Sequence, residues 1–131
     1  MNARTRRLAA ATVAVLAGAA CGDGTGPRAG NLNLALTGPV AARSAQFRVV
    51  GPQSGVTAGG ANLRVFVTPL GGDTTMVAVI ANAGHTLSES NIATVAVPDV
   101  GAASSYSITL LQVAAPDYSL QNASAFTVTR Q

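Results

Sequence analysis

The sequence of 131 residues predicts an all-β fold, a single antiparallel β-sandwich of about seven to eight strands. Three observations predict it. From residue 31 onward, apolar side chains alternate with polar ones at a period of two. Glycine, proline, asparagine and aspartate interrupt this alternation at intervals of about ten residues. No segment after residue 30 has the 3.6-residue apolar period of a capped helix.

The expected strands follow one another along the chain, separated by turn residues. In the first strand, Leu32, Leu34 and Leu36 share one face. Residues 74–81, TTMVAVIA, are apolar on both faces, which is typical of a strand in the middle of a sheet. The turn signals are Gly38-Pro39, Gly51-Pro52 and Pro69–Asp73. The alternating runs are residues 31–36, 46–49, 63–68, 74–81, 92–97, 104–114 and 126–129.

The N-terminal segment has a different pattern, that of an export signal. Arg4, Arg6 and Arg7 form a short cationic start, and the apolar run Leu8–Ala17 follows. That run is about ten residues long, whereas a helix that spans a bilayer needs about 20. A basic start, a short apolar run and then small residues are the layout of a cleaved secretory signal. We therefore expect residues 1–20 to be a signal peptide and leave them out of the fold.

The end of this signal is Leu16-Ala17-Gly18-Ala19-Ala20-Cys21, which resembles the lipobox of bacterial lipoproteins. Ala19, Ala20 and Cys21 match the family pattern, and Gly18 stands where the family usually carries a branched apolar residue. The resemblance implies cleavage before Cys21 and lipid attachment to its sulfur. The product would be a membrane-anchored lipoprotein of the cell envelope, facing the periplasm or the surface. Ordinary signal cleavage at these small residues is the alternative, and it would give a secreted protein.

Cys21 is the only cysteine, so the chain has no internal disulfide. A single cysteine in an exported protein calls for a chemical explanation, because a free thiol is a liability in an oxidising compartment. Lipid attachment supplies one, since it converts the thiol to a thioether. Buried lipid chains contribute about 0.8 kcal/mol per methylene, so several chains would hold the protein firmly on a membrane.

The predicted organisation has three parts. After the signal at residues 1–20, residues 21–30, CGDGTGPRAG, contain four glycines and one proline and are expected to form a flexible tether. Residues 31–131 are expected to form the β-sandwich domain, whose length is that of one small domain. A tether of this composition suits the space between a lipid and a folded domain.

Charge excludes one class of partner. The formal net charge of +3 comes from the signal, because five arginines and five acidic residues follow Cys21 and cancel. A neutral domain lacks the basic surface that nucleic-acid binding requires, so no nucleic-acid partner is expected. The residues that cancel are Arg28, Arg43, Arg48, Arg64 and Arg130 against Asp23, Asp73, Glu89, Asp99 and Asp117.

A second resemblance concerns the fold. Between Gly84 and Asp117, a short strand, IATVAVPDV, is followed by a longer one, SSYSITLLQVAAPD. This order resembles the C-terminal half of cohesin-type sandwiches and, more loosely, carbohydrate-binding and immunoglobulin-like modules. The resemblance implies a sandwich fold. It implies no function, because such folds host many functions.

Residues that could carry chemistry are few. His85, the only histidine, is expected at a turn, and no Gly-x-Ser-x-Gly motif accompanies it, so the protein is not expected to be an enzyme. No metal site and no cofactor are expected. Asp99 and Asp73 are interpreted as turn-capping residues. A calcium site that combines Asp73, Asp99 or Asp117 with backbone carbonyls is the alternative.

The aromatic residues divide into core and surface. Tyr106 and Phe126 are expected in the core, and Tyr118, beside Pro116-Asp117, is the aromatic residue expected at the surface. Tyr118 is either a contact residue or a packed tyrosine whose hydroxyl is bonded at a strand corner. We therefore expect a lipid-anchored sandwich with a non-catalytic binding or structural role and a protein or glycan partner. The alternatives are a small secreted hydrolase that uses His85 and a subunit of an envelope assembly.

Overall fold

The computed structural model describes residues 26–88 and 91–131. The predicted signal peptide and the first half of the predicted tether lie outside these residues. The second half is shorter than predicted, because the backbone of Arg28 bonds to Asp99 and Val100, and Gly30 already begins the first strand. The described part contains nine strands and two short 3₁₀ helices, η1 and η2. Their bounds are β1 Gly30–Thr37, β2 Ser44–Val50, β3 Gly55–Ala58, β4 Leu63–Gly71, β5 Thr74–Ala81, β6 Ala93–Val97, η1 Val100–Ser105, β7 Ser107–Ala114, β8 Leu120–Gln121, η2 Ala123–Ala125 and β9 Thr127–Arg130.

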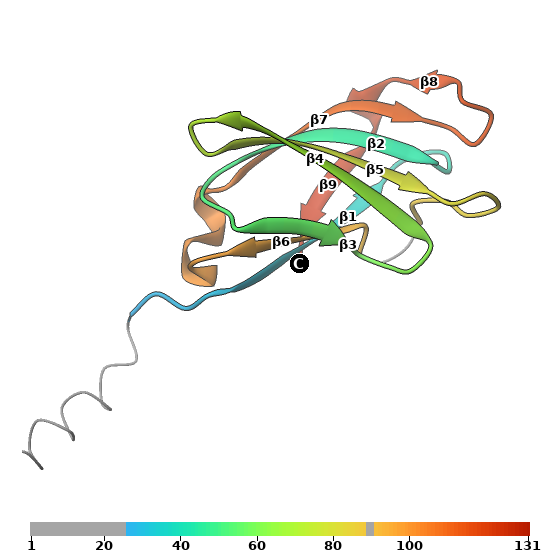
Figure 1. Cartoon of the computed structure of the whole chain (residues 1–131). Coiled ribbons are helices and arrows are strands. Elements are labelled where there is room, and N and C mark those ends of the chain that lie inside the picture. The colour runs from blue at the N-terminus through green and yellow to red at the C-terminus, as the bar shows by residue number, and fades with distance from the viewer. Residues whose placement is uncertain (1–25, 89–90) are drawn as a thin grey trace, which may run out of the picture.

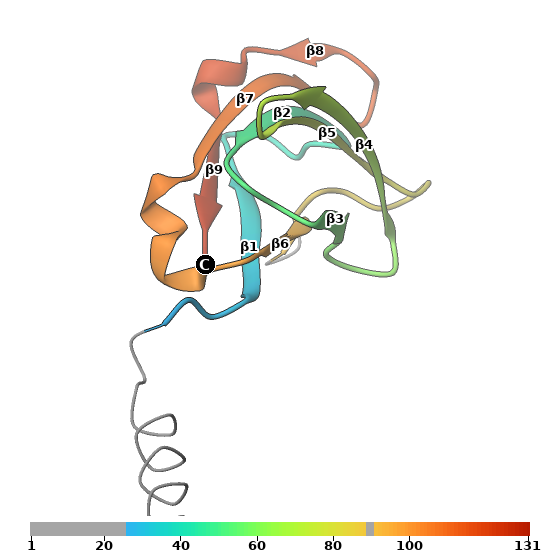
Figure 2. The same cartoon turned by 60° about the vertical axis from the view of Figure 1, so that its left-hand side comes forward.

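The strands form two antiparallel sheets that pack face to face (Figures 1 and 2). One sheet has four strands in the order β3-β6-β1-β9, and the other has five in the order β4-β5-β2-β7-β8. The predicted fold class, an antiparallel β-sandwich, is confirmed.

The core lies between the two sheets and follows from the alternation in the sequence. Because successive side chains of a strand point to opposite faces, every second residue of β2, β5 and β6 enters the core. Leu34 of β1, Phe47 of β2 and Val95 of β6 are fully buried there. Tyr106 and Phe126, both predicted core residues, are 5% and 7% exposed.

Residues 74–81 were expected in the middle of a sheet, and β5 indeed lies between β4 and β2. The turn before it is tighter than the sequence suggested. Residues 69–71 continue β4, and only Gly72 and Asp73 form the loop, both with positive φ, 59° and 61°. Two successive residues with positive φ are typical of the two-residue hairpin turns whose twist matches that of the strands. Asp73 therefore contributes to the β4–β5 turn through its left-handed backbone conformation.

Two short strands and both 3₁₀ helices depart from the expected pattern. The short strands β3 and β8 were not predicted. Residues 104 and 105, expected at the start of a strand, belong to η1 instead. Asp99 explains this, because its Oδ1 accepts a hydrogen bond from the backbone N–H of Gly101 at 2.9 Å and caps the helix. The predicted capping role of Asp99 is confirmed.

Tyr106 joins the connection after β2 to the start of β7. Its hydroxyl donates a hydrogen bond to the carbonyl oxygen of Pro52, and its ring lies against Gly51. Gly51 has a φ of 145°, and a Cβ atom added to it would collide with the ring. Only glycine fits at position 51, which is why the second alternating run ends there.

Burial raises the pKa of the Tyr106 hydroxyl, and the negative charges of Asp73 and Asp99 make smaller contributions in the same direction.

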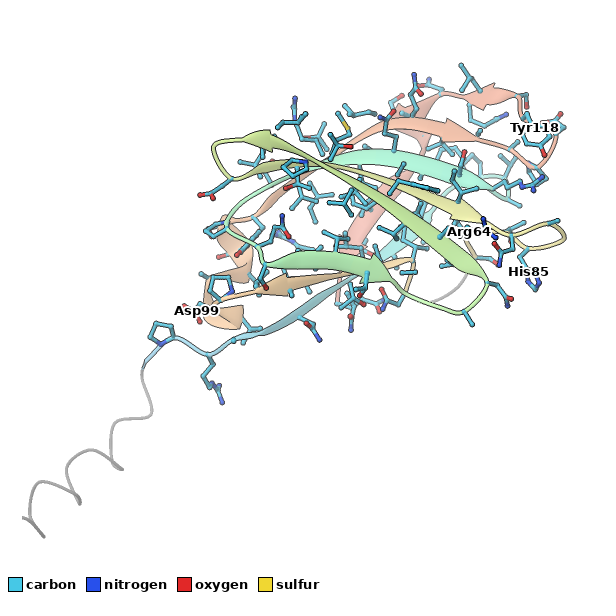
Figure 3. The ribbon with its side chains drawn as sticks, viewed as in Figure 1. Arg64, His85, Asp99 and Tyr118 are labelled. Atoms are coloured by element: carbon cyan, nitrogen blue, oxygen red, sulfur yellow. The ribbon has the colours of Figure 1, made fainter. Side chains whose placement is uncertain are left out.

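The sandwich has two distinct ends. At the near end the described chain enters β1 at Gly30, which pairs with Val97, and Asp99 follows soon after. Strands β1, β5 and β7 all run from the near end toward the opposite one, which we call the far end. The far end is made of the loops after these three strands. Tyr118 and His85 lie there, well away from Asp99 (Figure 3).

Candidate functional site

Cys21 and Gly18 lie outside the described residues, so lipid attachment to Cys21 stays a prediction. Within residues 26–88 and 91–131, no helix has the length and apolarity needed to cross a membrane.

His85 lies in the loop between β5 and β6, with its side chain exposed. Its backbone N–H donates to the carbonyl oxygen of Asn82 at 3.0 Å, which places it in a turn as predicted. Asp99 lies at the opposite end of the sandwich (Figure 3). The fold therefore separates His85 from Asp99.

The three aspartates considered for calcium have separate local roles. Asp99 caps η1 and also accepts a hydrogen bond from the N–H of Arg28 at 3.3 Å. Asp73 lies in the β4–β5 turn, and Asp117 lies in the β7–β8 loop at the far end. The fold thus does not bring the three carboxylates together. Among the described residues, no cluster of three or more His, Cys, Asp or Glu side chains could hold a metal ion.

The loop between β7 and β8 presents Tyr118 at the far end. The N–H of Tyr118 donates to the carbonyl oxygen of Ala115 at 2.9 Å, and the N–H of Ala115 donates to that of Ser119 at 3.0 Å. Pro116 follows Ala115, at the position where proline favours such a turn. Tyr118 itself has a φ of 68°, in the left-handed region. In this kind of loop that position usually holds glycine, because a side chain there is strained.

Arg43 holds the ring of Tyr118 in place. Its Nη1 donates a hydrogen bond to the Tyr118 hydroxyl at 2.7 Å, and its guanidinium carbon lies 5.0 Å from the ring centroid. The backbone of Arg43 is fixed as well, because its N–H donates to Ala114 and its carbonyl accepts from Ala81, both at 2.8 Å. Despite these contacts, Tyr118 is 73% exposed. The tyrosine is therefore oriented and accessible at the same time.

Asp117 stiffens the same loop. Its Oδ1 accepts hydrogen bonds from the hydroxyl of Ser119 at 2.6 Å and from the N–H of Ser119 at 3.0 Å. These two bonds, the hydroxyl bond first, lower the pKa of the Asp117 carboxyl below its ordinary value. Because they favour the ionised form, they stabilise the loop above the pKa of an unfolded aspartate. That contribution is lost as the pH falls through the lowered pKa.

We expect Ser119→Ala to raise the pKa of Asp117 toward the ordinary aspartate value, because the largest of its hydrogen-bond contributions is removed. An NMR titration of the Asp117 carboxyl measures this. Ser124→Ala is the matched control, since Ser124 makes the same pair of bonds to Asn122, at 2.8 Å and 3.1 Å. The control should leave the pKa of Asp117 unchanged. An unchanged pKa in Ser119→Ala would contradict the assignment of the cause.

A groove of about 250 Å³ adjoins this corner on the outer face of the five-stranded sheet. Two of its walls are exposed apolar side chains, Ile80 at 38% and Leu120 at 72%. Gln46 and Gln112, which face each other across β2 and β7, supply amides. No charged residue lines it. The lining residues are Ser44, Ala45, Gln46, Ala78, Ile80, Gln112, Ala114 and Leu120. We call Arg43, Tyr118 and this groove the corner site.

Comparisons with protein-family models, with curated proteins and with solved structures give no match to this chain.

Sequence reasoning found one member of the corner site and missed the others. Tyr118 was expected at the surface, and it is exposed. Its hydroxyl is bonded, as one of the two sequence interpretations expected, but the ring is not packed, and the contact role of Tyr118 stays a prediction. Arg43 and the groove were missed, because Arg43 and Tyr118 lie 75 positions apart in the chain. Only the strand order, which no motif encodes, brings them together.

Proposed function

We propose that this protein is a lipid-anchored, non-catalytic module of the cell envelope that binds a partner protein through the corner site. Cys21 would carry the lipid, the residues between Cys21 and Arg28 would form the tether, and the sandwich would present the corner site to the partner. The observation that carries the proposal is the backbone of Tyr118.

A tyrosine with a φ of 68° is costly, because a non-glycine residue in the left-handed region loses about 1–2 kcal/mol relative to its preferred conformation. Burial does not repay this cost, since the ring is 73% exposed. Strained residues persist mostly where the strain serves a function. The Arg43 hydrogen bond and the stacked guanidinium also hold the ring in one orientation, so a partner would meet it already ordered.

The placement of the corner site suits an anchored protein. The described chain enters the sandwich at the near end, and Tyr118 lies at the far end (Figure 3). The groove opens on the outer face of the five-stranded sheet, on the side away from β1 and its partners. A partner in the envelope could therefore reach Tyr118, Leu120 and Ile80 while the N-terminus is held at a membrane.

The chemistry of the site favours a protein over a glycan. Tyrosine and arginine are enriched among the residues that contribute most to protein–protein binding. The groove beside them is uncharged and has apolar walls, which suits an apolar protein side chain. A glycan platform needs several exposed aromatic rings, whereas Tyr106, Phe47 and Phe126 are buried and the exposed Phe66 does not line the groove.

The anchor is tested by intact-mass analysis of the mature protein and of a Cys21→Ala variant. We expect the protein to begin at Cys21, to carry the mass of attached lipid and to sediment with membranes. The Cys21→Ala variant should lack the lipid and leave the membrane fraction. A mature chain of unmodified mass that is found in the medium would contradict the anchor and support ordinary secretion.

The binding surface is tested by a photoreactive amino acid at position 120, with the protein expressed in its own cells. We expect a crosslinked complex with a single protein, and its loss when Tyr118→Ala is added. The matched control places the photoreactive residue at Ser104, an exposed residue of η1 at the near end. Equal crosslinking from positions 104 and 120 would contradict a specific corner site.

A further inference from the structure

The free edge of the five-stranded sheet is β4, Leu63–Gly71. With nine residues it is the longest strand among the described residues. Leu63 is buried and Val65 is half-buried, but from Phe66 onward the side chains are exposed on both faces, with Phe66 at 56% and Val67 at 38%. A long, apolar and uncovered edge strand is a template for pairing with another strand. Only a β-strand matches both its backbone groups and its two faces.

The register shows which backbone groups reach this edge. The N–H of Asn82 donates to the carbonyl oxygen of Asn62 at 2.8 Å, and these residues stand opposite each other, because Leu63 pairs with Ala81. In an antiparallel pair, hydrogen-bonded positions alternate with positions that face away. Residues 64, 66 and 68 therefore bond to β5, and the backbones of residues 63, 65, 67 and 69 face the open edge.

The donors at the open edge form a symmetric pattern. The N–H of Leu63 is already used, since it donates to the carbonyl oxygen of Gly60 at 3.2 Å. Pro69 has no N–H. Val65 and Val67 are left as donors, and in the described part of the chain no other backbone bond takes their N–H groups. Phe66 is the centre of this pattern. The next residue on each side, Val65 or Val67, has a free N–H, and the outward-facing residue beyond it, Leu63 or Pro69, has none.

We infer that β4 pairs with β4 of a second copy of this chain, antiparallel, with the two-fold axis at Phe66. Val65 of each copy then stands opposite Val67 of the other, and the two pairs satisfy all four free donors. Leu63 stands opposite Pro69 of the second copy, where neither residue has a donor to offer. The two Phe66 residues face each other as a non-hydrogen-bonded pair, the kind in which side chains lie closest.

The side chains fit this register as well as the backbone does. Arg64 stands opposite Thr68 of the second copy, so no like charges oppose each other across the axis. On the other face, Val65 packs beside Val67 of the second copy. A strand of unrelated sequence would match the β4 edge only by chance, because the free donors of β4 are symmetric about Phe66. That symmetry is the reason for choosing a second copy as the occupant.

The same edge limits the assembly to two copies. Pro69 and the irregularity between Pro69 and Gly71 end the regular ladder. The opposite edge of this sheet is β8, which has two residues, and the edges of the other sheet, β3 and β9, have four each. Each copy therefore offers one strand long enough to pair, and a symmetric contact through one strand closes as a dimer.

The dimer is compatible with the proposed anchor but does not depend on it. Antiparallel pairing sends the two N-terminal segments out at opposite ends of the joined sheet. The chain from Cys21 to Arg28, where the backbone first bonds to the sandwich, can extend by up to about 25 Å. Both lipids can therefore reach one membrane when the joined sheet lies along it, with both corner sites on the side that faces away.

Disulfide trapping with the full chain in its own cells tests the register. Phe66→Cys places two cysteines opposite each other at the axis, within the Cα separation that a disulfide requires. We expect a covalent dimer on a non-reducing gel. Leu70→Cys is the matched control, because Leu70 lies on the same strand with a similar exposed fraction, 53%. In this register the two copies of residue 70 are eight positions out of line, about 27 Å apart.

A covalent dimer from Phe66→Cys, with little from Leu70→Cys and none from the unaltered chain, supports the pairing. Equal yields from the two cysteine variants, or no dimer from Phe66→Cys, overturn it. A crosslink from Phe66→Cys to a different protein also overturns it, because the edge would then serve another strand.

A second pair of variants tests the same register without touching the axis. Thr68→Glu places a carboxylate opposite Arg64 of the second copy, and Thr68→Arg places a second guanidinium there. Residue 68 is exposed, so both variants should fold. Since two such pairs form per dimer, Thr68→Glu should lower the dimer dissociation constant roughly 2- to 30-fold, and Thr68→Arg should raise it by a similar factor. Analytical ultracentrifugation measures this, and shifts of the same sign, or a monomer at every concentration, overturn the proposal.

Discussion

Replacing Phe47 by alanine is expected to lower the free energy of unfolding by about 3–5 kcal/mol. Phe47 is 0% exposed and is the largest fully buried side chain of the core. Its strand, β2, lies in the middle of the five-stranded sheet, hydrogen-bonded to β5 on one side and to β7 on the other. The neighbouring strands are therefore fixed on both sides and cannot move in to fill the cavity that the ring would leave.

The size of this effect matters because a small domain has little stability to lose, typically 5–15 kcal/mol in all. Urea unfolding at low protein concentration, followed by circular dichroism, measures the change and keeps any dimer dissociation out of it. Phe66→Ala is the matched control, because Phe66 is 56% exposed. The control should change the free energy of unfolding by about 0.5 kcal/mol or less. Similar losses in the two variants would contradict the assignment of the core.

Phe47 and Phe66 together show which features of the fold the sequence could predict and which it could not. Alternation placed both residues in strands, and it put Phe47 on an inner face. It could not show that β4 is an edge strand, since edge position depends on which strands become neighbours. The short strands were missed because Gly55–Ala58 and Leu120–Gln121 contain too few residues to reveal a period.

Local chemistry was predicted better than long-range contacts. Asp99 after Pro98 predicted a capped turn, because the geometry involves only neighbouring residues. The exposure of Tyr118 followed in the same way from Pro116-Asp117. The contact between Arg43 and Tyr118 depends on β2 and β7 lying side by side. The corner site is thus a product of topology, and its most informative feature, the left-handed backbone of Tyr118, has no signal in the sequence.

That backbone leads to the last prediction, a comparison of Tyr118→Gly with Tyr118→Ala. Both variants remove the ring and its contacts with Arg43, so they differ only in how they tolerate a φ of 68°. Glycine adopts this conformation freely and alanine does not. We therefore expect Tyr118→Gly to be more stable than Tyr118→Ala by about 1–2 kcal/mol, measured by urea unfolding. Equal stabilities would show that the backbone at position 118 is not strained.

Binding should respond differently from stability. If the ring of Tyr118 is a main contact of the corner site, each variant should weaken partner binding by about 30-fold or more, the usual size of a loss at a central interface tyrosine. Crosslinking from position 120 provides the measurement. Tyr118→Gly would then combine the greater stability of the two variants with the same loss of binding. A residue kept only for the fold would give the opposite result, because a more stable loop without the ring would still crosslink. Greater stability combined with lost binding in Tyr118→Gly would therefore assign the strain at this position to partner binding and not to the fold.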